Sequence, residues 1–504
     1  MTTSVNKLLD AYLLDGKPIN SAVAAFYASL DQIASTSPTI ARSIIKEFSD
    51  QRQNLKLIAS ENYSSLSTQL AHGNLLTDKY AEGYAGHRFY AGCDNVDDIE
   101  SEATNLACEL FEAEHAYVQP HSGADANMTA FISILLAKVQ SPALEKLGQK
   151  NPNMVSQEEW SKVREEVHQQ KMLAMDYYSG GHLTHGYRFN FSSHLFDIYS
   201  YTVDPKTYVI DLDNIWKQLK EIKPLILLAG YSAYSRKLNF AKMKEMADEV
   251  GAVFMVDMAH FAGLVAGKVF TGDFNPVKHA DVVTSTTHKT LRGPRGGLVL
   301  CTKEYAEWVD KGCPSILGGP LPHAMAAKAV AFREALQPEF RDYAHKIVEN
   351  SQILAQAFIN NGMSVLTGGT DNHLFLSEVS TQFDITGRQA ETALRTCGIT
   401  LNRNSIPFDP NGPWYTSGLR FGTAAITTLG MGANEMNEIA KIVKLVLSNT
   451  TAAVIKGKKN RAKVVIDTKA EEQAKKRVSA LLDSYKLYPE LDIDLMRSAS
   501  YMSN

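Results

Sequence analysis

The chain has 504 residues, of which 44% are hydrophobic and 21% charged, the ordinary balance of a soluble globular protein. This balance excludes a disordered, collagen-like or disulfide-scaffold chain, and the length predicts two or more packed units. With 51 basic and 55 acidic residues the formal net charge is −4. No global field therefore draws the protein to nucleic acid or to an anionic membrane, and we expect neither partner.

The cysteines and the N-terminus indicate a cytoplasmic protein. The five cysteines are scattered, with no Cys-x-x-Cys pair, as expected of reduced thiols. Residues 1–20 lack the basic start and apolar core of a secretion signal. No apolar run approaches the ~20 residues that span a bilayer. The longest, at 251–265, is interrupted by Asp257 and His260.

In chain order, helical pieces come first, and we expect an N-terminal helical arm over residues 1–60. From about 115 to 300, short apolar runs alternate with longer amphipathic stretches such as 240–250. The apolar runs that predict buried strands are 116–119, 172–175, 225–229, 253–256, 282–283 and 298–300. Strands separated by helices predict a largely parallel sheet, whose ligands bind outside the carboxyl ends of the strands.

Two polar segments depart from this pattern. Residues 138–171 are rich in Glu, Gln, Lys and Asn and predict a solvated helical insertion. Residues 456–476 are rich in lysine and predict an exposed connection into a last amphipathic helix that ends near Tyr485. For this basic segment a solvated face is favoured over contact with nucleic acid.

A smaller unit begins near residue 340. It contains two predicted strands, at 374–379 and 419–421, with a helix near 388–397 between them. The predicted domain division is therefore a large domain at 61–335, which includes the insertion, and a small C-terminal domain at 336–504, which includes the basic segment.

The most informative segment is Asp281-Val-Val-Thr-Ser-Thr-Thr-His-Lys-Thr-Leu-Arg-Gly-Pro-Arg-Gly-Gly, which predicts a strand leading to Lys289. A lysine at the end of a buried strand is poorly solvated, which lowers its pKa and makes it a candidate Schiff-base amine. On position alone, a surface lysine after a strand is the favoured alternative. The glycines that follow Lys289 would let backbone pass close to a ligand.

An acid ends another apolar strand, at Asp257 in Val253-Phe-Met-Val-Asp. A carboxylate there is costly unless a cation faces it. The protonated pyridine nitrogen of pyridoxal phosphate (PLP) is such a cation, and an Asp partner is a requirement of PLP chemistry. A helix cap or a metal ligand is the alternative, and a histidine such as His260 is more often a satisfied interior residue.

Two further motifs follow predicted strands. Pro120-His-Ser-Gly-Ala opens a long apolar helix, so the N–H groups of Ser122 and Gly123 form a potential phosphate site, although Ser-Gly-Ala is also a common helix cap. In Gly180-Gly-His-Leu-Thr-His-Gly two histidines stand three residues apart. The glycines favour a loop, and no carboxylate or thiol accompanies the histidines, so we expect no metal site.

Taken in order, these segments resemble the serine hydroxymethyltransferases, which are fold-type I PLP enzymes. The resemblance covers about residues 50–450 outside the insertion. Its matching strings are Leu57-Ile-Ala-Ser-Glu-Asn-Tyr, Lys79-Tyr-Ala-Glu-Gly-Tyr, Gly181-His-Leu-Thr-His-Gly, Phe254-Met-Val-Asp-Met-Ala-His-Phe-Ala-Gly-Leu, Thr286-Thr-His-Lys-Thr-Leu-Arg-Gly-Pro-Arg-Gly-Gly and Thr416-Ser-Gly-Leu-Arg-Phe-Gly-Thr. It implies an α/β fold: an aspartate aminotransferase-like large domain with a mostly parallel seven-stranded sheet, and a smaller α+β C-terminal domain.

The resemblance also implies a cofactor site. PLP is implied to be covalent on Lys289, with Asp257 on the pyridine nitrogen and His182 stacked on the ring. The remaining implied cofactor contacts are Ser122, Gly123, Ser232 and His260, together with Gly318 and Gly319 from the neighbouring subunit of a homodimer. The implied catalytic residues are Lys289, Glu82, His288 and Thr286.

The substrate residues are implied in the same way. Arg420 matches the arginine that binds the amino-acid carboxylate, with a structural ion pair as its alternative. Glu82 is implied to carry a proton, with burial raising its pKa, although most glutamates are simply exposed. The implied substrate contacts are Ser60, Tyr80, Tyr90 and Arg420. The implied contacts of tetrahydrofolate, the co-substrate, are Tyr177, Gly181, His182, Leu183, Asn404, Gly412, Pro413 and Trp414.

Three positions depart from the family pattern. Ala124 replaces a serine of the phosphate loop, Phe89 replaces a tyrosine, and Tyr177 stands where leucine is common. We expect a homodimeric enzyme that interconverts serine and glycine and passes the one-carbon unit to tetrahydrofolate. A folate-independent threonine or β-hydroxy amino acid aldolase of the same fold remains open, as does a catalytically silent PLP-binding homologue.

Overall fold

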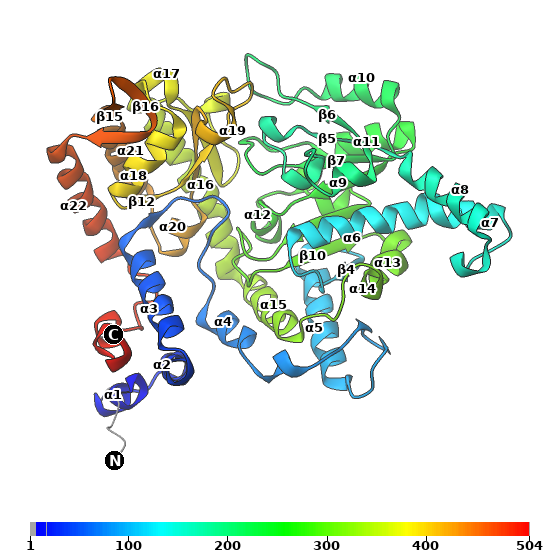
Figure 1. Ribbon diagram of the computed structural model, residues 1–504, viewed down its shortest axis with the longest axis horizontal. Coiled ribbons are helices and arrows are strands. Elements are labelled where there is room, and N and C mark those ends of the chain that lie inside the picture. The colour runs from blue at the N-terminus through cyan, green and yellow to red at the C-terminus, as the bar shows by residue number, and fades with distance from the viewer. Residues whose placement is uncertain (1–6, 17, 503–504) are drawn as a thin grey trace.

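The computed structural model describes residues 7–16 and 18–502, and its centre is a seven-stranded sheet (Figure 1). The strand order is β4-β10-β9-β8-β7-β5-β6, and β10 is antiparallel to both of its neighbours while β9, β8, β7, β5 and β6 are parallel. The strands are β4 (His115–Tyr117), β5 (Lys171–Met175), β6 (Asp197–Tyr201), β7 (Ile226–Gly230), β8 (Val253–Asp257), β9 (Val282–Thr286) and β10 (Gly297–Cys301). The predicted mostly parallel seven-stranded sheet is confirmed.

The central strands are apolar throughout because both faces of the sheet are covered. In β5, Leu173 and Met175 point into one core, and Met172 and Ala174 point into the other. The first core is closed by α5 (Asp94–Phe111), α10 (Leu212–Ile222), α11 (Phe240–Val250), α12 (Ala262–Ala266) and α15 (Pro322–Ala335). The second is closed by α6 (Gly123–Leu135) and α13 (Lys303–Asp310). The edge strand β6 was not predicted, since its sequence Asp-Ile-Tyr-Ser-Tyr is half polar and mostly exposed.

The polar segment after α6 is helical, as predicted. A π-helical turn at Leu136–Gln140 continues α6 into α7 (Ser141–Lys146), and α8 (Gln157–His168) follows. A capping box of Ser156 and Glu159 begins α8. The predicted helical segment is too long by its last residue, because Lys171 already belongs to β5.

The smaller unit contains a three-stranded antiparallel sheet in the order β11-β14-β13. Its strands are β11 (Leu374–Glu378), β13 (Asn402–Asn404) and β14 (Gly418–Gly422), and the helices packed on it are α18 (Gly387–Thr396), α21 (Ala433–Ser448) and α22 (Thr468–Ser484). The long helix α16 (Pro338–Asn360) joins the two units. Its Phe340 lies in the core of the large sheet, whereas its Phe358 lies in the smaller core.

The N-terminal helices pack against the C-terminal end of the chain (Figure 1). They are α1 (Leu8–Leu14), α2 (Ser21–Thr36) and α3 (Pro38–Gln53), and the short β1 (Leu55–Lys56) pairs in parallel with β12 (Ile399–Thr400). The Asp492 N–H donates to the Tyr27 hydroxyl at 2.8 Å, and Arg52 Nε donates to the Leu487 carbonyl at 2.8 Å. The arm is thus held to the C-terminal part of the chain from both α2 and α3.

The prediction for the basic segment is wrong. Residues 456–476 are not a connection, because β15 (Thr450–Ile455) and β16 (Lys458–Ile466) form an antiparallel hairpin. Lys456 and Gly457, both with positive φ, make its two-residue turn. The helix α22 ends at Ser484 close to the predicted position, but it is not the last, since α23 (Ile493–Ser498) follows. No helix of the described residues is long and apolar enough to cross a membrane.

Candidate active site

A cavity of about 630 Å³ lies where the carboxyl ends of the parallel strands face the smaller sheet. Lys289 and His260 line it from the large sheet, and Arg420 lines it from β14. The residues named from the sequence that line this cavity are Ser60, Tyr177, Gly181, His182, Leu183, Ser232, His260, His288, Lys289, Asn404, Pro413 and Arg420. Residues separated by more than 350 positions in the chain are thereby brought to one site.

Asp257 ends β8 behind the wall of this cavity and is buried. Its Oδ2 accepts hydrogen bonds from Asn127 Nδ2 at 2.9 Å and from His185 Nε2 at 3.2 Å. Burial alone raises the pKa of Asp257, but the hydrogen bonds from His185 and Asn127 hold that pKa well below its usual range. A buried, ionised carboxylate at this position is suited to a cationic ring nitrogen.

The two histidines of the loop after β5 have defined tautomers. His185 Nδ1 accepts the His182 N–H at 3.3 Å, so the neutral His185 ring carries its proton on Nε2 and donates it to Asp257. His182 Nδ1 accepts the Thr184 N–H at 3.2 Å. Burial lowers the pKa of His182 to about 4, so its ring is neutral at physiological pH. A neutral imidazole in the cavity wall can pack flat on an aromatic cofactor.

Asn127 connects these groups into one network. Its Oδ1 accepts from the Thr284 hydroxyl at 2.5 Å, and its Nδ2 also donates to Thr184 Oγ1 at 2.7 Å. Asn127, Thr184, His185 and Thr284 were not assigned from the sequence. The second histidine of Gly-His-Leu-Thr-His-Gly was the only signal for any of them, and its partner Asp257 lies 72 residues away.

Lys289 follows β9 and is buried with its side chain facing the cavity. Burial lowers the pKa of the Lys289 amine to about 8, while the charge of Asp257 opposes that shift. The surface-lysine alternative is therefore wrong. The neighbouring His288 also lines the cavity, and burial lowers its pKa to about 3. Thr286 does not line it: its hydroxyl donates to the Ala259 carbonyl at 3.3 Å.

Arg420 is fixed by two hydrogen bonds and has a free face. Its Nε donates to Asn402 Oδ1 at 3.0 Å, and its Nη1 donates to the Ser232 carbonyl at 2.6 Å. Burial lowers its pKa to about 10, which leaves it charged at neutral pH. Within the described part of the chain no carboxylate forms an ion pair with Arg420, so the structural ion pair weighed as its alternative is absent there.

The predicted phosphate residues lie at the start of α6. Ser122 is the N-cap, and its Oγ accepts the Asp125 N–H at 3.2 Å. Gly123 packs on β9, where a Cβ atom would lie 2.7 Å from Thr286 Cγ2. Neither residue lines the cavity of Lys289. The glycines after Lys289 approach protein groups: a Cβ atom on Gly297 would lie 2.2 Å from the Ser122 carbonyl oxygen.

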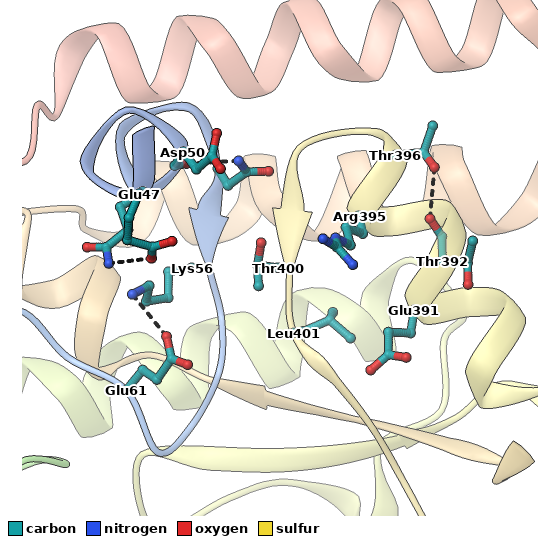
Figure 2. Close-up of a pocket in the computed structure, with 12 residues that line it drawn as sticks. Glu47, Asp50, Lys56, Glu61, Glu391, Thr392, Arg395, Thr396, Thr400 and Leu401 are labelled. Atoms are coloured by element: carbon teal, nitrogen blue, oxygen red, sulfur yellow. Dashed lines mark hydrogen bonds and ion pairs between the residues drawn. The ribbon is translucent and has the colours of Figure 1, made fainter. Parts of the chain in front are cut away.

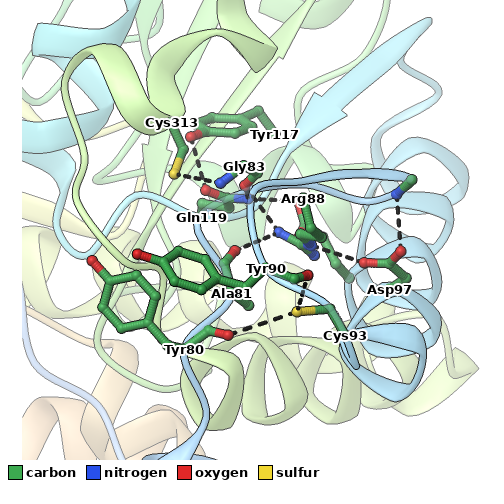
Figure 3. Close-up of polar contacts among 12 residues, drawn as sticks. Tyr80, Ala81, Gly83, Arg88, Tyr90, Cys93, Asp97, Tyr117, Gln119 and Cys313 are labelled. Carbon is green, nitrogen blue, oxygen red and sulfur yellow. Dashed lines mark hydrogen bonds and ion pairs between the residues drawn. The ribbon is translucent and has the colours of Figure 1, made fainter.

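Tyr80 and Tyr90 (Figure 3) form a separate group with Glu82 and the Gly318-Gly319 pair, called here the Glu82 cluster. The Tyr80 and Tyr90 rings meet edge to face at 4.9 Å, and a Cβ atom on Gly319 would lie 2.9 Å from the Tyr80 ring. About half of each tyrosine is exposed. None of the cluster's residues lines the Lys289 cavity.

The backbone of the Glu82 cluster is held rigidly. Arg88 donates to the carbonyls of Ala81 and Gly83, each at 2.9 Å, and pairs with Asp97 and Glu100. Cys313 Sγ accepts the Gly83 N–H at 3.3 Å and donates to the Gly318 carbonyl at 3.2 Å (Figure 3). One thiol thus links the segment that carries Glu82 to the glycine pair.

Two folate-side residues lie outside the cavity. Gly412 and Trp414 belong to the short helix α19 (Gly412–Tyr415), and 67% of Trp414 is exposed. Tyr177, which does line the cavity, packs against Tyr187 with the ring centroids 4.9 Å apart.

A larger cleft of about 860 Å³ lies between α3 and α18 (Figure 2). Most of its lining is polar, and its Lys56 and Glu61 form an ion pair at 2.9 Å. None of the residues assigned from the sequence lines it. This cleft is the larger of the two, but the cavity of Lys289 is the candidate active site because it contains buried charged side chains without ion-pair partners in the described chain.

The residues around the Lys289 cavity fit PLP. The cofactor needs an amine, an anion for its ring nitrogen and a flat contact for its ring. Lys289 provides the amine, Asp257 the anion and His182 the flat contact, and Asp257 and His182 belong to one buried hydrogen-bond network. Arg420 adds an uncompensated cation on the same side.

The chain was also compared with known proteins. A family model described as "Serine hydroxymethyltransferase" matches residues 33–145 and 162–443. A serine hydroxymethyltransferase of Treponema pallidum (strain Nichols) is 55% identical over 496 residues, which cover 98% of this chain and 86% of the relative. Enzymes of that name from Cutibacterium acnes (strain DSM 16379 / KPA171202) and Chlamydia muridarum (strain MoPn / Nigg) are 53% and 51% identical. The Cutibacterium match covers 93% of this chain and 96% of the relative, and the Chlamydia match covers 98% of this chain and 100% of the relative.

Proposed function

The chain belongs to the serine hydroxymethyltransferase family, and we propose that its reaction takes place in the cavity of Lys289 and Arg420. It is a PLP-dependent hydroxymethyltransferase that interconverts serine and glycine, with tetrahydrofolate as the one-carbon carrier. Full-length similarity to curated family members favours this function over an aldolase or a silent homologue. The observation that carries the site assignment is the buried Lys289 side chain in this cavity, together with a buried Asp257 that is held by His185 and Asn127.

The side chains of the cavity have distinct tasks in this proposal. Lys289 binds the cofactor, Asp257 holds a proton on the ring nitrogen, and His182 packs on the ring. PLP, when bound, supplies an electron sink for the substrate α-carbon. Arg420 binds the substrate carboxylate through its free guanidinium face, while Asn402 and the Ser232 carbonyl keep that guanidinium in place.

The homodimer is part of the same proposal. The Glu82 cluster does not reach the Lys289 cavity of its own chain, and its tyrosines are half exposed. We infer that Glu82, Tyr80, Tyr90, Gly318 and Gly319 complete the site of a partner subunit. Glu82 carries the proton there, Gly318 and Gly319 hold the phosphate with Ser122 and Gly123, and Tyr80 and Tyr90 close the substrate site with Ser60.

Subunit mixing tests the dimer. A Lys289→Gln dimer and a Glu82→Gln dimer should each be inactive in the folate-dependent conversion of serine to glycine, yet a mixture exchanged after partial unfolding should recover this activity. Recovery occurs because one site of a hybrid dimer then has both wild-type residues. Activity that stays absent in verified hybrids would overturn the shared site.

The folate residues, the domain boundaries and the location are proposed on separate grounds. Tyr177, Gly181, Leu183, Asn404 and Pro413 line one side of the cavity and suit a flat heteroaromatic ring, with Gly412 and Trp414 at its rim. The divisions at residues 60 and 335 remain proposals. We propose a cytoplasmic location because all five cysteines are free thiols.

Peptide mapping tests the site directly. Borohydride reduction of the holoenzyme should fix the cofactor to Lys289. Lys328, the other buried lysine of the described chain, is an internal control because it lies on a different tryptic peptide. A label on Lys328, or spread over surface lysines, would overturn the proposed site.

A further inference from the structure

Lys328 is a buried lysine to which neither the sequence nor the proposed function assigns a role. It lies on α15 and is 1% exposed. Its Nζ donates to the carbonyls of Val118 at 2.6 Å, Pro120 at 2.9 Å and Gly297 at 2.9 Å. These carbonyls come from the segment that joins β4 to α6 and from the first residue of β10. The ammonium therefore holds two neighbouring chain segments together.

The geometry identifies the charged form of this side chain. Three acceptors at hydrogen-bond distance need three N–H donors, which an ammonium has and a neutral amine lacks. Burial lowers the pKa of Lys328 to about 7, and the charges of Glu100 and Asp125 oppose that shift. Among residues 7–16 and 18–502, no carboxylate forms an ion pair with Lys328. Glu100 is instead paired with Arg88. A buried ammonium without a counter-ion is costly unless an anion binds nearby.

The position of Lys328 points to that anion. Pro120 stands two residues before Ser122, and the Gly297 N–H donates to the Pro120 carbonyl at 2.8 Å. A Cβ atom on Gly297 would lie 2.2 Å from the Ser122 carbonyl oxygen, and one on Gly296 would lie 2.4 Å from Lys328 Cε. Because Gly296 and Gly297 have no Cβ atoms, the Lys328 side chain packs against the first and the Ser122 turn packs against the second. The ammonium lies directly behind the start of α6.

We propose that Lys328 is a positioning residue for the cofactor phosphate. Its ammonium fixes the turn that presents the N–H groups of Ser122 and Gly123, and it places a buried positive charge behind the phosphate dianion. This role rests on the proposed function, which puts the phosphate at that turn. The competing interpretation is a purely structural tie between β4 and β10, with no effect on the phosphate.

Two ligands that differ only in the phosphate separate these interpretations. Dissociation constants of PLP and of pyridoxal are measured on apoenzyme prepared from the wild type and from Lys328→Met. Loss of one buried charge should reduce the preference for PLP over pyridoxal by about tenfold or more. Pyridoxal affinity should change little, because its ring contacts do not involve Lys328. Equal weakening of both ligands would overturn the proposal in favour of the structural tie.

Three further variants make the result decisive. Lys328→Gln retains amide donors for the carbonyls and should give the same loss of preference, which covers the case of a methionine variant that does not fold. Lys328→Arg keeps the charge and should keep most of the preference. Lys244→Met is the matched control, since Lys244 pairs with Asp248 and with Asp281 at the opposite end of the strands. Its preference should equal that of the wild type, and a loss there as large as in Lys328→Met would overturn the proposal.

Ser122→Gly distinguishes failure of the proposal from failure of the phosphate site itself. This variant removes a direct donor while leaving Lys328 in place, and its preference for PLP should also fall. If the Ser122 variant keeps the full preference, the phosphate does not bind at this turn. That outcome would overturn both the site assignment and the role of Lys328.

Discussion

The cavity around Lys289 and the Glu82 cluster differ in how far one chain completes them. In the cavity, Asp257, His185, Asn127 and Thr284 form an unbroken hydrogen-bond network that needs nothing from outside the chain. In the cluster the backbone is equally well held, but the functional side chains face outward, with Tyr80 51% and Tyr90 49% exposed. One region has its buried polar groups satisfied within the chain, whereas the other is a well-held surface whose tyrosines are half exposed.

This difference has a chemical counterpart. The cavity contains the groups that any PLP enzyme acting on an amino acid needs: an amine, a ring-nitrogen partner and a carboxylate site. The cluster contains Glu82, the candidate proton carrier for transfer of the one-carbon unit. The chemistry common to many reactions is thus built within one chain. In the proposed homodimer, the step specific to folate depends on assembly.

The largest effect is expected for a substitution in the Glu82 cluster, which should affect mainly the folate-dependent reaction. Glu82→Gln should lower folate-dependent conversion of serine to glycine by about 10²–10⁴-fold, the usual contribution of a positioned general acid or base. Folate-independent cleavage of a β-hydroxy amino acid should remain within about tenfold of wild type, because it does not use that proton. Assays of both reactions on the same preparation test this. Equal loss of both would assign Glu82 to the common chemistry.

Asp257→Asn tests the other region, the cavity around Lys289. Removing one partner of a buried charge pair costs about 3–5 kcal/mol, so turnover should fall by about 10²–10³-fold or more. Both reactions should fall together, because both use the ring nitrogen. Asp176→Asn is a suitable control, since Asp176 caps a short 3₁₀ helix after β5 through its Oδ2. Selective loss of the folate reaction in Asp257→Asn would contradict the assignment.

A smaller effect is expected at the thiol that joins the two parts of the Glu82 cluster. Cys313→Ala removes the hydrogen bonds with Gly83 and Gly318, each of which contributes about 1 kcal/mol. The folate reaction should weaken several-fold, whereas Cys313→Ser, which retains donor and acceptor, should remain near wild type. Steady-state constants for both variants test this. Similar losses in both would mean that the size or polarity of the sulfur matters, rather than its hydrogen bonds.

The same comparison explains what the sequence could predict. Asp257 could be found because it ends a run of apolar residues, where a charged side chain is conspicuous. Lys289 follows a polar stretch, and the resemblance of its segment to the family assigned it. Asn127 and His185 could not be found, because their role depends on reaching Asp257 across 130 and 72 residues of chain. The same limit applies to Lys328, whose three carbonyl partners lie on segments 31 or more residues away.

The prediction of secondary structure was limited in a similar way, because buried strands were found and exposed strands were missed. Fully buried strands such as β7 and β8 were predicted within a residue or two, because continuous apolar runs mark them. The exposed strands β6 and β16 were missed, since one is half polar and the other begins Lys-Lys-Asn-Arg-Ala-Lys, where five of six residues are polar or charged. In β16 exposed and partly buried positions alternate, but the charged residues obscure this two-residue period in the sequence. The hairpin turn at Lys456-Gly457 was missed for the same reason.

The smallest expected effect concerns the phosphate turn, where Ala124 replaces the serine usual in the family. Ala124 is in the first turn of α6, and Ser122 Oγ already accepts the Asp125 N–H as the helix cap. A hydroxyl at position 124 would therefore be an additional donor rather than a replacement for Ser122. Ala124→Ser should tighten PLP by about 1 kcal/mol, or about fivefold, provided that the hydroxyl reaches the phosphate.

The turnover number at saturating cofactor should stay unchanged, because the phosphate anchors the cofactor and does not react. Dissociation constants of PLP and of pyridoxal for both proteins test this prediction. Pyridoxal is the control, since the added hydroxyl has no partner on it. Tightening of PLP alone would show that Ser122, Gly123 and Lys328 leave the dianion one donor short. Unchanged PLP affinity would mean that the helix N-terminus and the buried ammonium already satisfy it, and that the departure at position 124 has no consequence for the cofactor.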